Sequence, residues 1–123
     1  MEHTAESIGR LIQSHPYAYA NEDELQAGIA GVLAEDDLTP RREVRLSDRD
    51  RLDVLVDLGP RTLGIEVKIA GAAGDVRRQL LRYAASERVD ELMLVTTVRR
   101  HLACLPDEIG GKPLTRVLLR GGL

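Results

Sequence analysis

The most constraining feature of this sequence is a pair of segments, 51–57 and 62–69, on either side of Gly59-Pro60. In both segments apolar residues alternate with other residues, and β-branched side chains are frequent. A period of two is typical of strands with one face against a core, and the glycine–proline pair predicts a turn between them. The two segments are therefore predicted to form an antiparallel hairpin.

The register of this hairpin divides its side chains unequally between the two faces of the sheet. A loop centred on Gly59-Pro60 pairs Asp57 with Thr62, and it pairs Asp53 with Glu66. The face expected against the core carries only apolar side chains, namely Leu52, Val54, Val56, Leu63, Ile65, Val67 and Ile69. The opposite face is predicted to carry Arg51, Asp53, Leu55, Asp57, Thr62, Gly64, Glu66 and Lys68.

In one of these opposed pairs, Asp53 and Glu66, both residues are acidic. Directly opposed side chains have Cβ atoms about 4.5–5.5 Å apart, so the charges of Asp53 and Glu66 would destabilise the pairing unless a cation lies between them. A hard cation such as Mg²⁺ binds one or two carboxylates together with water and a substrate phosphate. Lys68 follows Glu66 on the same face. The alternative that stays open is an ordinary solvated face of the hairpin.

Periodicity in the rest of the chain predicts helices on both sides of a mixed sheet. The helix that lies between Lys68 and a buried strand implies a right-handed crossover and a parallel pairing. The order αβββαβ, with a final strand, defines an α/β fold with a mixed central sheet flanked by helices. The remaining elements are expected as a short helix before Ser14, a helix from Asn21 to near Asp37, a strand at 44–46, a helix at 75–88, a strand at 92–95 and a strand at 115–120.

The first long helix is predicted to direct one acid inward. Asn21 is a suitable N-cap, and Glu22 falls in the same angular sector as Leu25 and Ile29, with Gln26 beside it. An inward acid is costly unless it is paired or bound to a metal. Alternatively, the acids of this first turn only interact with the helix dipole.

The later helix carries a polar flank and a basic stripe. Gln79 and Tyr83 are four residues apart and therefore neighbours on one side of the helix, and Arg78 and Arg82 form the adjoining stripe. A basic stripe beside a carboxylate pair suits a phosphodiester backbone. The segment 99–101, Arg-Arg-His, is predicted to be an exposed basic cluster.

The charge distribution permits a nucleic-acid partner despite a net charge of −3. Residues 1–40 carry a net charge of −7, whereas residues 41–123 carry +4. The acidic first third is a candidate surface for a protein partner. No apolar stretch approaches the roughly 18–20 residues of a membrane helix, and the start of the chain has no apolar signal region. We therefore expect a single cytoplasmic domain over 1–123 with no membrane contact.

The candidate residues, taken in order, resemble the PD-(D/E)xK nuclease superfamily. The resemblance covers residues 21–97, and the Gln-x-x-x-Tyr element is similar to that of RecB-type nuclease domains. The small single-domain layout is similar to Holliday-junction resolvases and phage-encoded nucleases. One departure is Leu52, which stands where proline often precedes the aspartate. The motif residues are Glu22, Asp53, Glu66-Val67-Lys68 and Gln79-x-x-x-Tyr83.

The resemblance implies a restriction-endonuclease-like core and a role for each motif residue. Asp53 and Glu66 would bind Mg²⁺ or Mn²⁺, with the carbonyl of Val67 as a further ligand. Lys68 would orient or deprotonate the attacking water, or stabilise the charge of the transition state. Glu22 would bind a second metal or order its water. Two further residues, Gln79 and Tyr83, would shape the site and hold the DNA backbone.

The expected function is that of a metal-dependent deoxyribonuclease, with endonuclease favoured over exonuclease. A chain of 123 residues offers few DNA contacts, so a homodimer is expected. The location would be the cytoplasm, or the host cytoplasm if the chain is phage-encoded. The alternative is a non-catalytic module of nuclease fold that binds nucleic acid, or a protein partner through residues 1–40.

Overall fold

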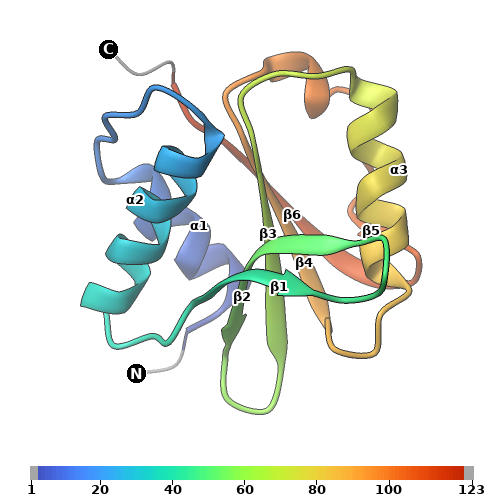
Figure 1. Cartoon of the computed structure of the whole chain (residues 1–123), viewed down its shortest axis with the longest axis horizontal. Coiled ribbons are helices and arrows are strands. Elements are labelled where there is room, and N and C mark those ends of the chain that lie inside the picture. Colours follow the sequence, from blue (N-terminus) through green and yellow to red (C-terminus); the bar gives the residue numbers. More distant parts are fainter. Residues whose placement is uncertain (1–2, 121–123) are drawn as a thin grey trace.

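A mixed six-stranded sheet forms the middle layer of the chain, with helices on both of its faces (Figure 1). The computed structural model describes residues 3–120. The strand order across the sheet is β1-β2-β3-β4-β6-β5. In chain order the elements are α1 (Ala5–Gln13), α2 (Glu22–Glu35), β1 (Arg41–Arg45), β2 (Arg51–Asp57), β3 (Thr62–Lys68), α3 (Ala73–Ala84), β4 (Glu91–Thr96), the 3₁₀-helix η1 (Arg99–His101), β5 (Glu108–Ile109) and β6 (Lys112–Leu118).

The strand pairings confirm the predicted α/β class and the mixed sheet. β1, β2 and β3 are antiparallel neighbours, whereas β3, β4 and β6 run parallel. The hairpin register pairs Asp57 with Thr62 and Val54 with Ile65, as predicted. The bounds differ in places: β1 begins at Arg41, α3 begins at Ala73, and the two-residue strand β5 was not predicted. Only pairing with β6 makes so short a segment a strand.

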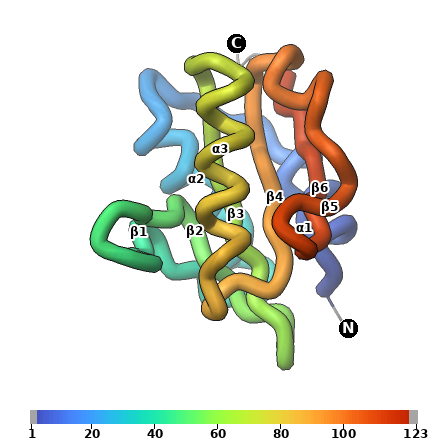
Figure 2. The backbone as a smooth tube through the Cα atoms, turned by 90° about the vertical axis from the view of Figure 1, so that its right-hand side faces the viewer, coloured from blue at the N-terminus to red at the C-terminus, as the bar shows by residue number. Residues whose placement is uncertain are grey.

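The sheet separates two apolar clusters. α1 and α2 pack on one face, where Ile8 and Ile29 meet Ile65. α3 packs on the other face, where Leu80 meets Leu92 (Figure 2). β2 and β3 lie in the interior of the sheet, and each has five consecutive buried residues. Within residues 3–120, no helix combines the length and the apolar character needed to cross a membrane.

The start of α2 is fixed by local hydrogen bonds and by a contact with β1. The side chain of Asn21 accepts the N–H of Glu24 at 2.9 Å, which confirms the predicted N-cap. The Arg42 guanidinium donates to the Asp23 carboxylate at 2.8 Å and to the Gln26 side chain at 3.4 Å. These contacts hold the first turn of α2 against the edge of the sheet.

β2 bends at Asp53, and this bend departs from the prediction. The β1–β2 register pairs Arg42 with Val54 but skips the next opposed pair, Glu43 and Asp53. Glu43 has a φ of 56°, in the left-handed region that residues other than glycine rarely adopt. β1 and the adjoining part of β2 project from the body of the sheet (Figures 1 and 2). The prediction that Leu52 shares a face with Val54 was wrong, because beyond the bend Leu52 packs in the cluster beneath α3.

His101 links the ends of two parallel strands from a buried position, at 1% exposure. Its Nε2 donates to the Gly71 carbonyl at 2.7 Å, and its Nδ1 lies 2.8 Å from the Thr96 hydroxyl. Because the Gly71 carbonyl only accepts, Nε2 is the donor in this hydrogen bond. The prediction that 99–101 is exposed holds for Arg99 and Arg100 but is wrong for His101, which these hydrogen bonds draw inward.

Replacing His101 with alanine should destabilise the fold. The change removes a buried side chain and its hydrogen bonds with the Thr96 hydroxyl and the Gly71 carbonyl, so we expect a loss of about 2–4 kcal/mol in the free energy of unfolding. Urea denaturation followed by circular dichroism measures this loss. The neighbouring Arg99→Ala variant should stay within about 0.5 kcal/mol of wild type, since Arg99 is exposed. Equal stability of H101A and wild type would contradict this account.

Candidate active site

A polar pocket of about 250 Å³ lies where α2, α3 and the first three strands meet. Seven of the predicted site residues line it, from four different elements. The structure therefore brings together side chains that are up to 61 positions apart in the sequence, from Glu22 to Tyr83. The lining residues are Glu22, Glu43, Arg49, Asp50, Arg51, Asp53, Glu66, Lys68, Gln79, Arg82 and Tyr83.

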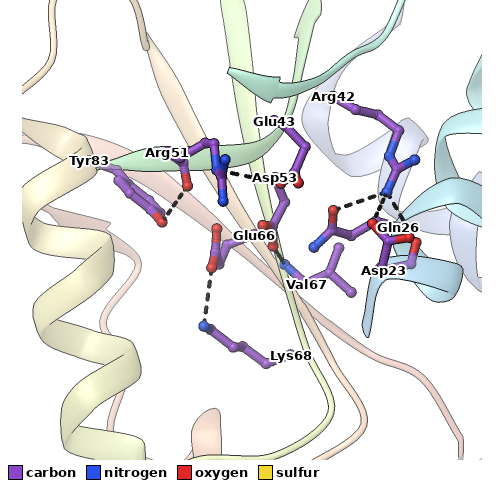
Figure 3. A network of polar contacts seen from close by, with 10 residues as sticks. All are labelled: Asp23, Gln26, Arg42, Glu43, Arg51, Asp53, Glu66, Val67, Lys68 and Tyr83. Atoms are coloured by element: carbon purple, nitrogen blue, oxygen red, sulfur yellow. Dashed lines mark hydrogen bonds and ion pairs between the residues drawn. The ribbon is translucent and has the colours of Figure 1, made fainter. Parts of the chain in front are cut away.

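The predicted carboxylate pair lies at the floor of this pocket (Figure 3). The side chains are almost fully buried, with Asp53 8% and Glu66 2% exposed. The Oδ2 atom of Asp53 accepts the N–H of Val67 at 2.8 Å. The Oε2 atom of Glu66 lies 3.2 Å from Nζ of Lys68. The other oxygen of Glu66, Oε1, is buried and has no hydrogen-bond partner among the described residues.

Burial makes it costly for these carboxyl groups to ionise. It is the largest cause that raises the pKa of Glu66 to about 8, followed by the negative charge of Asp53, and Lys68 acts in the opposite direction. Burial also raises the pKa of Asp53 to about 6, against the lowering effect of the Val67 N–H. The pKa of the Tyr83 hydroxyl is raised as well, first by burial and then by Glu66 and Asp53. A positive charge in the pocket would favour the ionised carboxylates.

Glu22 approaches the pair from the start of α2. Its Oε2 atom accepts the N–H of Ile69 at 3.0 Å, directly after β3 ends. Its charge contributes to the raised pKa of Asp53. The predicted inward orientation of Glu22 thus agrees with the structure. Within residues 3–120, however, no three His, Cys, Asp or Glu side chains come close enough together to hold a metal ion, so a direct ligand role for Glu22 stays a prediction.

The predicted support residues on α3 differ in their positions. Gln79 and Tyr83 both line the pocket, and the Tyr83 hydroxyl donates to the Arg51 carbonyl at 3.0 Å. Arg82 also lines it, but its guanidinium Nε donates to the Asp50 carboxylate at 2.9 Å. Arg78 does not line the pocket. Its guanidinium pairs with Asp75 one turn earlier on the exposed side of α3.

Of the predicted basic stripe, only Arg82 therefore reaches the pocket, and both arginines have acidic partners. Spacing on a helix gives the angle of a side chain about the axis, but it does not show which side chains an acid will neutralise. Asp75 forms an ion pair with Arg78, and Asp50 forms one with Arg82. Any contact of Arg78 or Arg82 with a phosphate must compete with an ion pair that already exists.

Four lining residues come from the β1–β2 region, and sequence reasoning gave three of them no role in the site. Glu43, Arg49 and Asp50 have no periodic pattern, because they lie at the distorted end of β1 and in the loop that follows. Arg51 was expected on the same face as Asp53, and it lines the pocket as expected. The bend in β2 is what carries this loop to the pocket mouth.

The pocket contains two carboxyl groups of the kind that a hard divalent cation binds. Mg²⁺ is held by one or two carboxylates, with waters and substrate phosphate completing its octahedron. Asp53 and Glu66 supply these carboxylates, and the unpartnered Oε1 of Glu66 is a free acceptor at the site. The chain matches no protein-family model, no curated protein and no solved structure. The functional interpretation therefore depends on the geometry of this pocket.

The raised pKa values predict that the protein without metal loses stability as the pH rises. Folding raises the pKa of Glu66 from 4.5 to about 8 and the pKa of Asp53 from 3.8 to about 6. At pH values between about 4 and 8 the folded state therefore binds more protons than the unfolded state. The contribution of this pair to stability is then full below about pH 4 and is lost as the pH increases to about 8. We expect a loss on the order of several kcal/mol, measured by urea unfolding in EDTA.

The Glu66→Gln variant should show a shallower loss over the same pH range, because it removes one buried charge and relieves the other. Asp57→Asn serves as the control, since Asp57 is exposed at the far end of β2 and should leave the profile unchanged. A wild-type stability that rises between pH 5 and 8 would contradict the buried pair.

Proposed function

We propose that this chain is a metal-dependent deoxyribonuclease with a restriction-endonuclease-like core, related to the PD-(D/E)xK nucleases. Three features support the proposal. The antiparallel hairpin and the following parallel strand agree with the order expected for such a core. An acid pair and a lysine share one pocket, and Glu22, Gln79 and Tyr83 line the same pocket.

One observation carries the proposal: among the described residues, a buried oxygen of Glu66 has no hydrogen-bond partner, and a second buried carboxyl group, Asp53, lies beside it. A buried acid normally has its hydrogen bonds satisfied, and an unpaired buried charge is strongly destabilising. Glu66 keeps a buried oxygen without a partner and has Asp53 as a neighbour. Such an arrangement is unfavourable for stability alone, so it supports a site that binds a cation.

The protein side chains have distinct tasks in the proposed reaction. Asp53 and Glu66 would hold Mg²⁺ or Mn²⁺, with the Val67 carbonyl as a further ligand. The cation would supply Lewis-acid activation of the phosphate and lower the pKa of a bound water. Lys68, 3.2 Å from Glu66, would orient the attacking water or stabilise charge on the phosphate. Glu22 would order water near Asp53, or bind a second metal.

The Asp53→Asn variant should lose DNA cleavage. The change removes a ligand charge but preserves the shape of the side chain, and we expect the rate to fall by at least about 10²–10³. Supercoiled plasmid, linear duplex, single strands and branched junctions, each with Mg²⁺ or Mn²⁺, provide the assay. Cutting of the supercoiled plasmid also tests the proposed preference for endonuclease over exonuclease action.

Asp57→Asn is the matched control for this assay. Asp57 lies on the same strand, but it is exposed and does not line the pocket, so its loss should leave cleavage unchanged. The nuclease proposal would be rejected if wild type cuts none of these substrates, or if D53N cuts as fast as wild type.

The second candidate is a non-catalytic module of this fold that binds nucleic acid or a protein. The ion pairs of Arg78 and Arg82 favour the protein-binding form of this candidate, because they leave these arginines less available to a phosphate. The acidic residues 1–40 would then be the surface for a protein partner. Tight binding of DNA without metal and without cleavage would select this candidate. In either case light scattering at several concentrations tests the proposed homodimer.

A further inference from the structure

We infer that Arg49, in the β1–β2 loop, binds a phosphate of the nucleic-acid backbone. This phosphate is the neighbour of the scissile phosphate, which lies at the carboxylate pair. This inference rests on the proposed nuclease function, and it deepens that proposal by assigning the backbone contact to a particular residue. Sequence reasoning had assigned the backbone contacts to residues of α3, namely Arg78, Gln79, Arg82 and Tyr83.

The loop presents Arg49 from a rigid turn. The side-chain oxygen of Ser47 accepts the N–H groups of Arg49 at 3.2 Å and Asp50 at 3.1 Å. The Leu46 N–H donates to the Asp50 carbonyl at 2.8 Å, which closes the turn. A phosphate that meets a side chain on such a turn requires little ordering of the backbone, which favours binding.

Further contacts fix this turn against α3. The Asp50 carboxylate accepts from Arg82 at 2.9 Å, and the Arg51 carbonyl accepts from the Tyr83 hydroxyl at 3.0 Å. Beyond α3, Arg88 donates to the Arg45 carbonyl at 3.0 Å. The loop therefore has a fixed position at the pocket mouth, where Arg49 lines the same pocket as the carboxylate pair.

Arg49 also differs from the other lining arginines in its charge balance. Arg82 is paired with Asp50, and Arg51 lies 3.9 Å from Glu43. Within residues 3–120, Arg49 has no acidic partner within ion-pair distance. Its guanidinium is therefore available to a phosphate, with which arginine forms strong charge-assisted hydrogen bonds.

The opposite wall of the pocket directs the strand toward this loop. The first turn of α2 carries three consecutive acids, Glu22 to Glu24, and Glu22 lines the pocket. These acids repel a polyanion, whereas Arg49 attracts it. A strand whose scissile phosphate reaches the carboxylate pair would therefore place a neighbouring phosphate on Arg49.

The test is DNA binding in the absence of cleavage. Fluorescence anisotropy in EDTA, with a labelled single strand and a labelled duplex over a range of salt concentrations, gives the affinity and its salt dependence. The Arg49→Ala variant should bind roughly tenfold more weakly. Its slope of log affinity against log salt should be smaller by about 1, the loss of one phosphate contact.

Two further variants separate this role from others. Arg10→Ala on α1 makes the same charge change at an exposed site on the other side of the sheet, and it should bind as wild type does. Arg49→Lys should recover the salt slope. Thermal melting of each variant, expected to equal that of wild type, shows that the fold is intact.

The outcomes distinguish this inference from the proposed function. If wild type binds and cuts DNA while R49A binds with the same affinity and salt slope, the role of Arg49 is overturned and the nuclease proposal stands. If wild type neither binds nor cuts any substrate, both fail. An equal loss of affinity in R10A and R49A would indicate that the net charge of the protein alone determines the effect, and it would also overturn the specific role of Arg49.

Discussion

The structure of this chain depends on how the sheet holds two acids side by side away from water. The antiparallel pairing of β2 and β3 extends to Val54 and Ile65, and the next residues, Asp53 and Glu66, are neighbours. Their burial raises the pKa of both carboxyl groups. Neighbouring groups reduce the cost only in part, through the Val67 N–H and the Lys68 amine. The remaining cost is what a cation would offset, and it accounts for the predicted fall in stability at higher pH.

The surrounding elements position this pair rather than neutralise it. α2 is capped by Asn21 and held against β1 by Arg42, so that Glu22 reaches the end of β3. On the other side α3 supplies Tyr83, which bonds to the strand beside the pocket. The β1–β2 loop is held at the pocket by its contacts with α3. Fold stability and the proposed chemistry therefore share these contacts, and loss of the ion pair between Asp50 and Arg82 should affect both.

Much of the site could be predicted from the sequence because it follows short-range rules. The alternation in the hairpin and its central turn give the register that opposes Asp53 and Glu66, and Lys68 follows two residues later on the same face. What escaped prediction depends on contacts between distant segments. The bend that moves Leu52 to the other face, the pairing of Arg82 with Asp50 and the buried position of His101 all require knowledge of which elements meet. No local pattern encodes them.

The most direct test of the account is the position of a divalent cation in crystals of the protein soaked with Mn²⁺. The anomalous signal of manganese locates the ion without reference to activity. We expect one peak between the carboxylate oxygens of Asp53 and Glu66, with the Oε1 atom of Glu66 as a ligand, and no such peak in crystals of the Asp53→Asn variant. A soaked wild-type crystal with no manganese at this position, and with Glu66 still bonded only to Lys68, would contradict the claim that the buried pair is a metal site.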